Sequence, residues 1–175
     1  MQKRYLLAPG PTPVPPEALL AMAMPIIHHR APDFLPVLDS AKKGLQWLYQ
    51  TQNDVLILCS TGTGGMVGSV NNFLNPGDEA LVINGGKFGE RWTKICQAYN
   101  VKVTEIVVEW GMTVKPGQVE EALRKNPKIK AVYIQANETS TGVYHDVQAI
   151  AAVVKKTDAI FVVDAISALV AHDIR

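Results

Sequence analysis

The sequence has little of what marks several broad classes of protein. It contains only two cysteines, Cys59 and Cys96, both in apolar contexts, which argues against a disulfide framework and is typical of a reduced, cytosolic protein. A formal net charge of +1 gives no electrostatic basis for binding nucleic acid or an acidic membrane. We find no apolar run of membrane-spanning length, signal peptide or internal repeat. We therefore expect a cytoplasmic globular protein without nucleic-acid or membrane partners.

Histidine is also scarce, and its placement does not favour a metal site. His28 and His29 are adjacent in a loop between prolines, but neighbouring side chains diverge on most backbones. His145 and His172 add no ligand spacing. We predict no metal ion, and we expect the loop at 25–32 to contribute polar side chains to a cleft.

Apolar strands and helices alternate along most of the 175 residues, which predicts an α/β domain with a mostly parallel sheet. Strands are expected at 54–59, 79–83, 102–108, 130–135 and 159–163. Helices are expected at 16–22, 34–51, 90–99, 116–124 and 147–156, with a further helix after the glycine-rich turn at 60–65. Residues 1–15 are predicted to form an extended arm and residues 16–175 the sheet domain. The prolines at 8–16 keep the arm from becoming a helix, so it is either a linker or a segment lying across a site or a partner subunit.

The glycine-rich turn interrupts an apolar run and precedes residues with helical spacing. A strand, a tight turn and a helix in this order favour phosphate binding, because the helix start offers unpaired N–H groups and a positive dipole end. The other interpretation is that the glycines serve turn geometry alone. The turn lacks the lysine of a Walker motif, and Val67 stands where a dinucleotide fingerprint has its third glycine. The next strand ends at Asn84 rather than at an acidic ribose ligand, so ATP and NAD are disfavoured.

Polar residues follow the other predicted strands, at the edge of a parallel sheet where ligands bind. Asp164 comes directly after four apolar residues, where a carboxylate needs a cation or a hydrogen-bond donor. Pyridoxal phosphate would meet this need, because its protonated ring nitrogen would face Asp164. Its phosphate would lie at the turn near Thr61, and its flat face would stack on Phe88. Thr139 would hydrogen-bond near its ring oxygen. Taken singly, Asp164 also fits a helix cap or loop anchor, Phe88 a core residue and Thr139 a turn former.

Several stretches together resemble the class V aminotransferases of fold type I, within them the alanine–glyoxylate and serine–glyoxylate (serine–pyruvate) aminotransferases. They occur in the family's order over nearly the whole chain: residues 9–14, 28–30, 60–64, 85–91, 137–142 and 163–167. The resemblance implies a three-layer α/β sandwich, the large domain of a pyridoxal-phosphate-dependent transferase, here incomplete and without the small C-terminal domain.

The resemblance also implies roles for individual residues. Thr61, Gly62 and Thr63 would hold the phosphate, and Phe88 would stack on the ring. Thr139 would contact the ring, and Ile166 would pack on its opposite face. Asp164, the one residue expected to act in catalysis, would pair with the pyridine nitrogen. The arm at 10–14 would border the substrate entrance.

This sequence departs from the family in its length. The family's Schiff-base lysine and substrate-binding arginine both follow the Asp164 block at positions beyond this sequence, and Lys87, Lys155 and Lys156 are not at the lysine position. We expect transamination of alanine or serine with glyoxylate or pyruvate, by a homodimer or with a complementing C-terminal chain. The alternative is a non-catalytic fragment or assembly module that needs a second chain to complete its fold. An NAD-binding oxidoreductase domain is a third, disfavoured interpretation.

Overall fold

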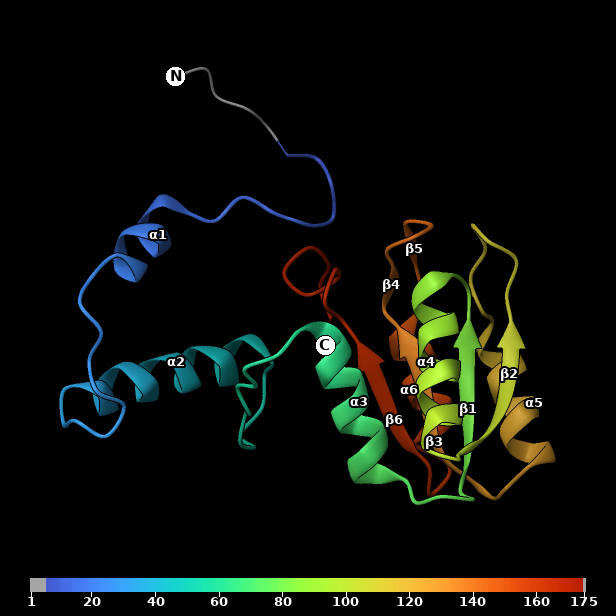
Figure 1. Cartoon of the computed structure of the whole chain (residues 1–175). Coiled ribbons are helices and arrows are strands. Elements are labelled where there is room, and N and C mark those ends of the chain that lie inside the picture. The colour runs from blue at the N-terminus through green and yellow to red at the C-terminus, as the bar shows by residue number, and fades with distance from the viewer. Residues whose placement is uncertain (1–5, 175) are drawn as a thin grey trace. The chain divides into compact units, whose positions relative to one another are not determined.

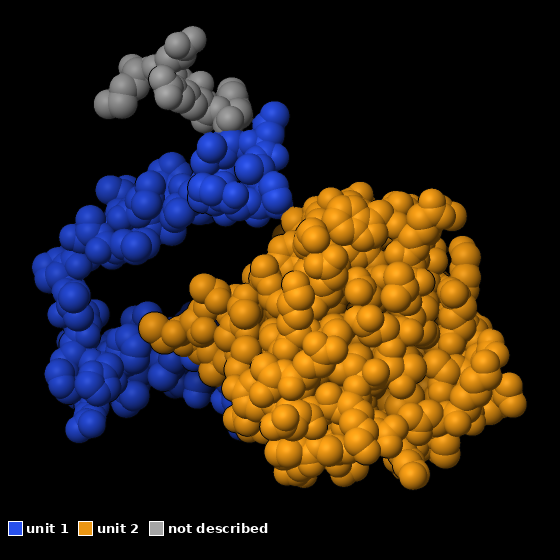
Figure 2. All heavy atoms as spheres, turned by 45° about the vertical axis from the view of Figure 1, so that its right-hand side comes forward, with its two compact units in different colours: residues 1–57 blue, residues 58–175 orange. Residues whose placement is uncertain are grey.

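The computed structural model describes residues 6–174 and divides the chain into two compact units, residues 1–57 and residues 58–175 (Figure 2). Unit 1 contains the helices α1 (Pro16–Met22) and α2 (Phe34–Leu48). None of its described residues is buried. The helix predicted at 16–22 is confirmed. The next helix ends three residues earlier than predicted, because Gln50 has a φ of 51°, outside the range of a right-handed helix.

Unit 2 is built on one parallel sheet, in the order β2-β1-β3-β6. Its long apolar strands β1 and β3 lie in the centre, as expected for strands covered on both faces. The strands are β1 (Glu79–Asn84), β2 (Lys102–Val107), β3 (Ile129–Gln135) and β6 (Ile160–Asp164). The helices are α3 (Gly62–Phe73), α4 (Lys87–Ala98), α5 (Pro116–Lys125) and α6 (Val147–Val154).

Helices cover both faces of the sheet (Figure 1), and alternating residues of β1 and β3 divide the core between those faces. Val82 and Tyr133 pack with the apolar stripes of α3 and α4, whereas Ile83 and Ile134 pack with those of α5 and α6. The α/β class and the parallel sheet are thereby confirmed. Asp146 caps α6 as predicted, since its carboxylate accepts a hydrogen bond from the Ala149 backbone N–H at 2.9 Å.

Two local predictions are wrong. Residues 54–59 form no strand, although Leu56, Ile57 and Leu58 have the composition of one. A strand requires backbone hydrogen bonds to a neighbour, and no described strand pairs with this segment, whose three apolar side chains are 80%, 58% and 56% exposed.

The second wrong prediction is the loop at 136–142, part of which forms a short ribbon. The strands β4 (Asn137–Glu138) and β5 (Val143–Tyr144) pair antiparallel after β3. Gly142, with a φ of 72°, supplies the left-handed residue that this tight reversal needs. No helix within residues 6–174 combines the length and apolar composition needed to cross a membrane.

Candidate functional site

Four segments of unit 2 meet beyond the carboxyl ends of β1, β3 and β6 (Figure 1). They are the start of α3, the start of α4, the β4–β5 ribbon and the turn after β6. Direct contacts join them: Arg91 Nη1 donates to Thr63 Oγ1 at 3.0 Å, and the Lys87 backbone N–H donates to Ser140 Oγ at 3.0 Å. The parallel topology thus brings together the polar segments that follow β1, β3 and β6, and the hydrogen bond from Arg91 joins the α3 start to them.

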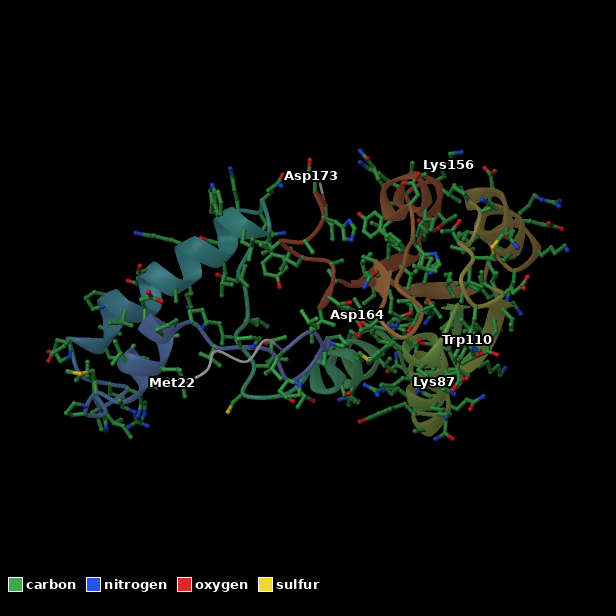
Figure 3. The ribbon with its side chains drawn as sticks, turned by 90° about the horizontal axis from the view of Figure 1, so that it is seen from above. Met22, Lys87, Trp110, Lys156, Asp164 and Asp173 are labelled. Atoms are coloured by element: carbon green, nitrogen blue, oxygen red, sulfur yellow. The ribbon has the colours of Figure 1, made fainter. Side chains whose placement is uncertain are left out.

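Asp164 is the last residue of β6, an outer strand of the sheet (Figure 3). Its Oδ1 accepts a hydrogen bond from the Ile166 backbone N–H at 3.0 Å. Burial raises the pKa of this carboxyl group, and the neighbouring Glu138 raises it further, whereas the Ile166 N–H and the Arg91 guanidinium oppose the rise. A cation placed against the carboxylate would therefore offset the cost of its ionised form.

The α3 start presents the backbone that was predicted to hold a phosphate. Thr61 is the N-cap residue, and its carbonyl accepts from the N–H groups of Gly64 and Gly65 at 2.9 and 3.3 Å. Within the part of the chain that the structure describes, the Gly62 and Thr63 N–H groups have no hydrogen-bond partner, as is normal for the first turn of a helix. These two donors are available to an anion.

Two glycines of this turn lie close to neighbouring side chains. A Cβ on Gly62 would lie 2.6 Å from Ile166 Cδ1, and a Cβ on Gly64 would lie 2.7 Å from the Ser60 Cβ and still closer to its Oγ. Ile166, predicted to pack on a ring face, is 68% exposed and lies against the start of α3. The turn after β6 and the α3 start are therefore neighbours, which places Asp164 near the two free N–H groups.

Phe88 belongs to the first turn of α4 and is half-buried. The Arg91 guanidinium lies 4.7 Å from the centroid of its ring, one face of which is thus occupied by a cation. Because Arg91 also donates to Thr63, it links the starts of α4 and α3. The sequence pattern marked Phe88, but Arg91 appeared there only as part of a family stretch.

Thr139 lies just after β4, and its Oγ1 is 2.7 Å from Ser167 Oγ. Asn137 Nδ2 donates to the same Ser167 oxygen at 3.0 Å. These hydrogen bonds tie the ribbon to the turn that follows Asp164. Thr139 is therefore oriented by Ser167, a residue to which the sequence analysis gave no role.

Gln135 carries an unpaired polar group at the same edge. It is 3% exposed, and its Nε2 has no hydrogen-bond partner among residues 6–174. It stands opposite Asp164 in the β3–β6 register, and two residues after Tyr133, which faces α3 and α4. Buried amide groups are nearly always satisfied, so this edge has a donor to offer to a ligand.

Glu138 is the main site residue that sequence reasoning missed. It is fully buried, and its carboxylate accepts from Phe88 N at 3.3 Å and from Gly89 N at 3.0 Å. Ser140 N and Ser140 Oγ donate to it at 3.2 and 2.6 Å. A glutamate in a polar stretch is expected to lie in an exposed loop. The N–H groups of Phe88 and Gly89, which donate to Glu138, lie 50 and 49 residues away in the sequence, so only the fold reveals that Glu138 is buried.

The histidines are not gathered into a metal site. His28 and His29 stack with ring centroids 4.6 Å apart, and His28 Nδ1 accepts from the Arg30 N–H. Among residues 6–174 no three His, Cys, Asp or Glu side chains are grouped so that they would hold a metal ion. His145 is buried, and its Nδ1 accepts from the Val114 N–H at 3.3 Å.

Comparison with known proteins identifies the family. The chain belongs to the class-V aminotransferases, whose family model matches residues 4–175, and the resemblance found in the sequence is thereby confirmed. It is 44% identical, over 98% of its length, to the soluble hydrogenase 42 kDa subunit of Anabaena cylindrica, of which it covers 46%. It is 37% identical to the L-aspartate–glyoxylate aminotransferase of Paracoccus denitrificans, over 97% of this chain and 44% of that protein.

A solved structure agrees with these relatives. The crystal structure of an alanine–glyoxylate aminotransferase from Nostoc sp. matches with a TM-score of 0.90 and 28% identity, over 97% of this chain and 45% of that one. The chain thus spans less than half the length of the relatives and of this solved structure.

Proposed function

We propose that unit 2 is the cofactor bed of a pyridoxal-phosphate-dependent aminotransferase. The observation that carries the proposal is the half-buried Asp164 carboxylate at the edge where the Gly62 and Thr63 N–H groups are free. The residues present fit pyridoxal phosphate: an anion acceptor, an aromatic ring at Phe88, a carboxylate for the ring nitrogen and an unpaired amide at Gln135. When bound, the cofactor supplies an electron sink for carbanion chemistry.

Each residue has a defined task in this proposal. Gly62 and Thr63 donate N–H groups to the phosphate, and the Thr63 side chain is held by Arg91. Asp164 keeps the ring nitrogen protonated, with Ile166 N–H holding one carboxylate oxygen in place. Phe88 and Ile166 would hold the ring of the cofactor between them. Thr139, which is oriented by Ser167, would hydrogen-bond to its ring oxygen.

The substrates we propose are a small amino acid, alanine or serine, and glyoxylate or pyruvate. The names of two relatives support this class, because both are aminotransferases that use glyoxylate: the alanine–glyoxylate enzyme from Nostoc sp. and the aspartate–glyoxylate enzyme from Paracoccus denitrificans. The latter makes aspartate a third donor to test. Proton transfer at the substrate needs a lysine that we do not assign to any position of this sequence.

We further propose that the cofactor bed works with a second chain or a second copy. In the part of unit 1 that the structure describes no side chain is buried, and Ile26 and Trp47 are 99% and 80% exposed. Apolar side chains exposed to this extent indicate a surface that another protein segment covers. A homodimer and a complementing C-terminal chain both meet this requirement.

The test is binding of pyridoxal phosphate by the 175-residue chain, measured by equilibrium dialysis. We expect one site per chain, competition by pyridoxamine phosphate and no competition by NAD or ATP. Absence of binding, or displacement by NAD, would contradict the proposal. Glycine formation from glyoxylate, after coexpression with the C-terminal half of a relative, would test the donors alanine, serine and aspartate.

A further inference from the structure

Glu138 has an environment that is unusual for a carboxylate. It is fully buried, yet within residues 6–174 no lysine, arginine or histidine forms an ion pair with it. A buried carboxylate without a cation is costly unless several donors satisfy its oxygens. The residue is therefore stable here only because of the hydrogen bonds it accepts.

Two of those hydrogen bonds come from the first turn of α4, and the other two come from Ser140. The N-cap residue of this helix is Gly86, which has no side chain to cap the helix. Instead Glu138 accepts from the N–H groups of Phe88 and Gly89, and Ser140 Oγ accepts from the N–H of Lys87. Ser140 Oγ also donates to Glu138 at 2.6 Å. Two side chains of the ribbon thus satisfy three consecutive N–H groups that a helix start leaves open.

The close approach also depends on Gly86. A Cβ at this position would lie 2.7 Å from Glu138 Cγ and Cδ and would collide with Ser140 Oγ. The negative charge of Glu138 lies at the positive end of the α4 dipole, which strengthens the contact. The start of α4 and the ribbon therefore behave as one rigid piece, and Phe88 projects from that piece.

We propose that Glu138 is a positioning residue: a helix cap supplied by a different segment, which fixes the first turn of α4 and through it the ring of Phe88. The inference deepens the proposed function, on which its relevance to the cofactor rests. We do not propose that Glu138 contacts the cofactor. It determines the position of the Phe88 ring. A second consequence is electrostatic, since its charge also acts on Asp164.

The first measurement is amide hydrogen exchange over residues 86–91, which does not depend on any ligand. Glu138→Gln keeps the length of the side chain but replaces one acceptor oxygen with an NH2 group, so at least one helix N–H loses its partner. We expect exchange in this segment to accelerate about tenfold. The matched control is Asp146→Ala, which removes the cap of α6 and should accelerate exchange at the start of that helix only.

The second measurement is the dissociation constant of pyridoxal phosphate in a double-mutant cycle with Phe88→Leu. We expect Glu138→Gln to weaken binding about tenfold in the presence of Phe88 and about twofold or less in its absence, because the cap acts through the ring. Asp146→Ala should leave the dissociation constant unchanged. If Glu138→Gln does not fold, Ser140→Ala, which removes the bridge to the Lys87 N–H, takes its place with a smaller effect.

Two results would overturn the inference. Unchanged exchange over 86–91 in a folded Glu138→Gln variant would show that the carboxylate does not hold the helix start. An equal loss of affinity with and without Phe88 would show that it does not act through the ring. If the unaltered chain fails to bind pyridoxal phosphate, the proposed function falls together with the role toward the ring, whereas the exchange comparison still decides whether Glu138 fixes the helix.

Discussion

The variant Asp164→Asn should move stability and cofactor affinity in opposite directions. Asparagine keeps the shape of the side chain and an oxygen for the Ile166 N–H, but it removes the charge. In the cofactor-free chain, burial and the Glu138 charge both disfavour the ionised carboxylate, and the partly exposed position screens some of this cost. We therefore expect the free energy of unfolding to rise by about 1 kcal/mol at pH 7.

The same substitution should weaken pyridoxal phosphate binding about 10- to 100-fold. A hydrogen bond to a charged group contributes about 1.5 to 3 kcal/mol, which corresponds to that range of dissociation constants. The asparagine amide cannot keep the ring nitrogen protonated. The substitution therefore removes this interaction from the cofactor-bound state and leaves the cofactor-free state without a matching loss. Equilibrium dialysis with the unaltered chain as reference gives the ratio.

The pH dependence supplies a further check on Asp164. The pKa of its carboxyl group in the folded chain is raised above the ordinary value for aspartate, so this group favours the folded state most strongly below that ordinary value. The contribution is lost as the pH rises through the folded-state pKa. The stability gap between Asp164→Asn and the unaltered chain should therefore open with rising pH and close at about pH 3, as measured by urea unfolding. A variant less stable at pH 7, or one that binds the cofactor equally well, would refute the reasoning.

Three further sets of substitutions follow from the geometry of unit 2. Gly86→Ala should cost about 1 to 3 kcal/mol of unfolding free energy because its Cβ meets the ribbon, whereas Gly117→Ala, with nothing within 4 Å, should stabilise α5 by up to about 1 kcal/mol. Tyr133→Phe should raise the unfolding free energy by about 1 kcal/mol, because it removes a buried hydroxyl that has no partner in the described part of the chain. Burial lowers the pKa of His145, so stability should decline as the pH falls below 6.5, and His145→Asn should flatten that decline. Urea unfolding at several pH values measures all of these effects.

Each of these expectations has a result that contradicts it. Equal changes in unfolding free energy for Gly86→Ala and Gly117→Ala would mean that the ribbon does not pack tightly against Gly86. A loss of stability in Tyr133→Phe would mean that the hydroxyl has a partner, such as a water molecule. An unchanged slope between about pH 5 and 7 in His145→Asn would assign the titration to another group.

The fold was predictable from sequence wherever local pattern and tertiary context agree. The apolar runs that became β1, β3 and β6 also have partners in the sheet, so their assignment is confirmed. Residues 54–59 have the same composition but no neighbour to pair with, and pairing is not encoded in a single run. The two-residue strands of the ribbon were missed because Gly142 and the polar residues before it outweigh any strand pattern in so short a segment.

The site could be predicted only in outline. The topology rule placed Asp164 at this edge, because every parallel strand delivers its following residue there. The α3 start was assigned to the same edge through a strand at 54–59 that does not form. The contacts within the edge were not predictable: Arg91 reaches Thr63 from 28 residues away, and Glu138 reaches α4 from 49 residues away. Periodicity assigns residues to faces of an element but contains no information about which loops will touch.

We propose that one pyridoxal phosphate bridges the start of α3 and Asp164. NMR titration of the ¹⁵N-labelled chain with the cofactor tests this bridge. We expect the amide signals of residues 61–64 and 164–166 to shift together with a single dissociation constant. Shifts confined to one of these segments, or to neither, would contradict it.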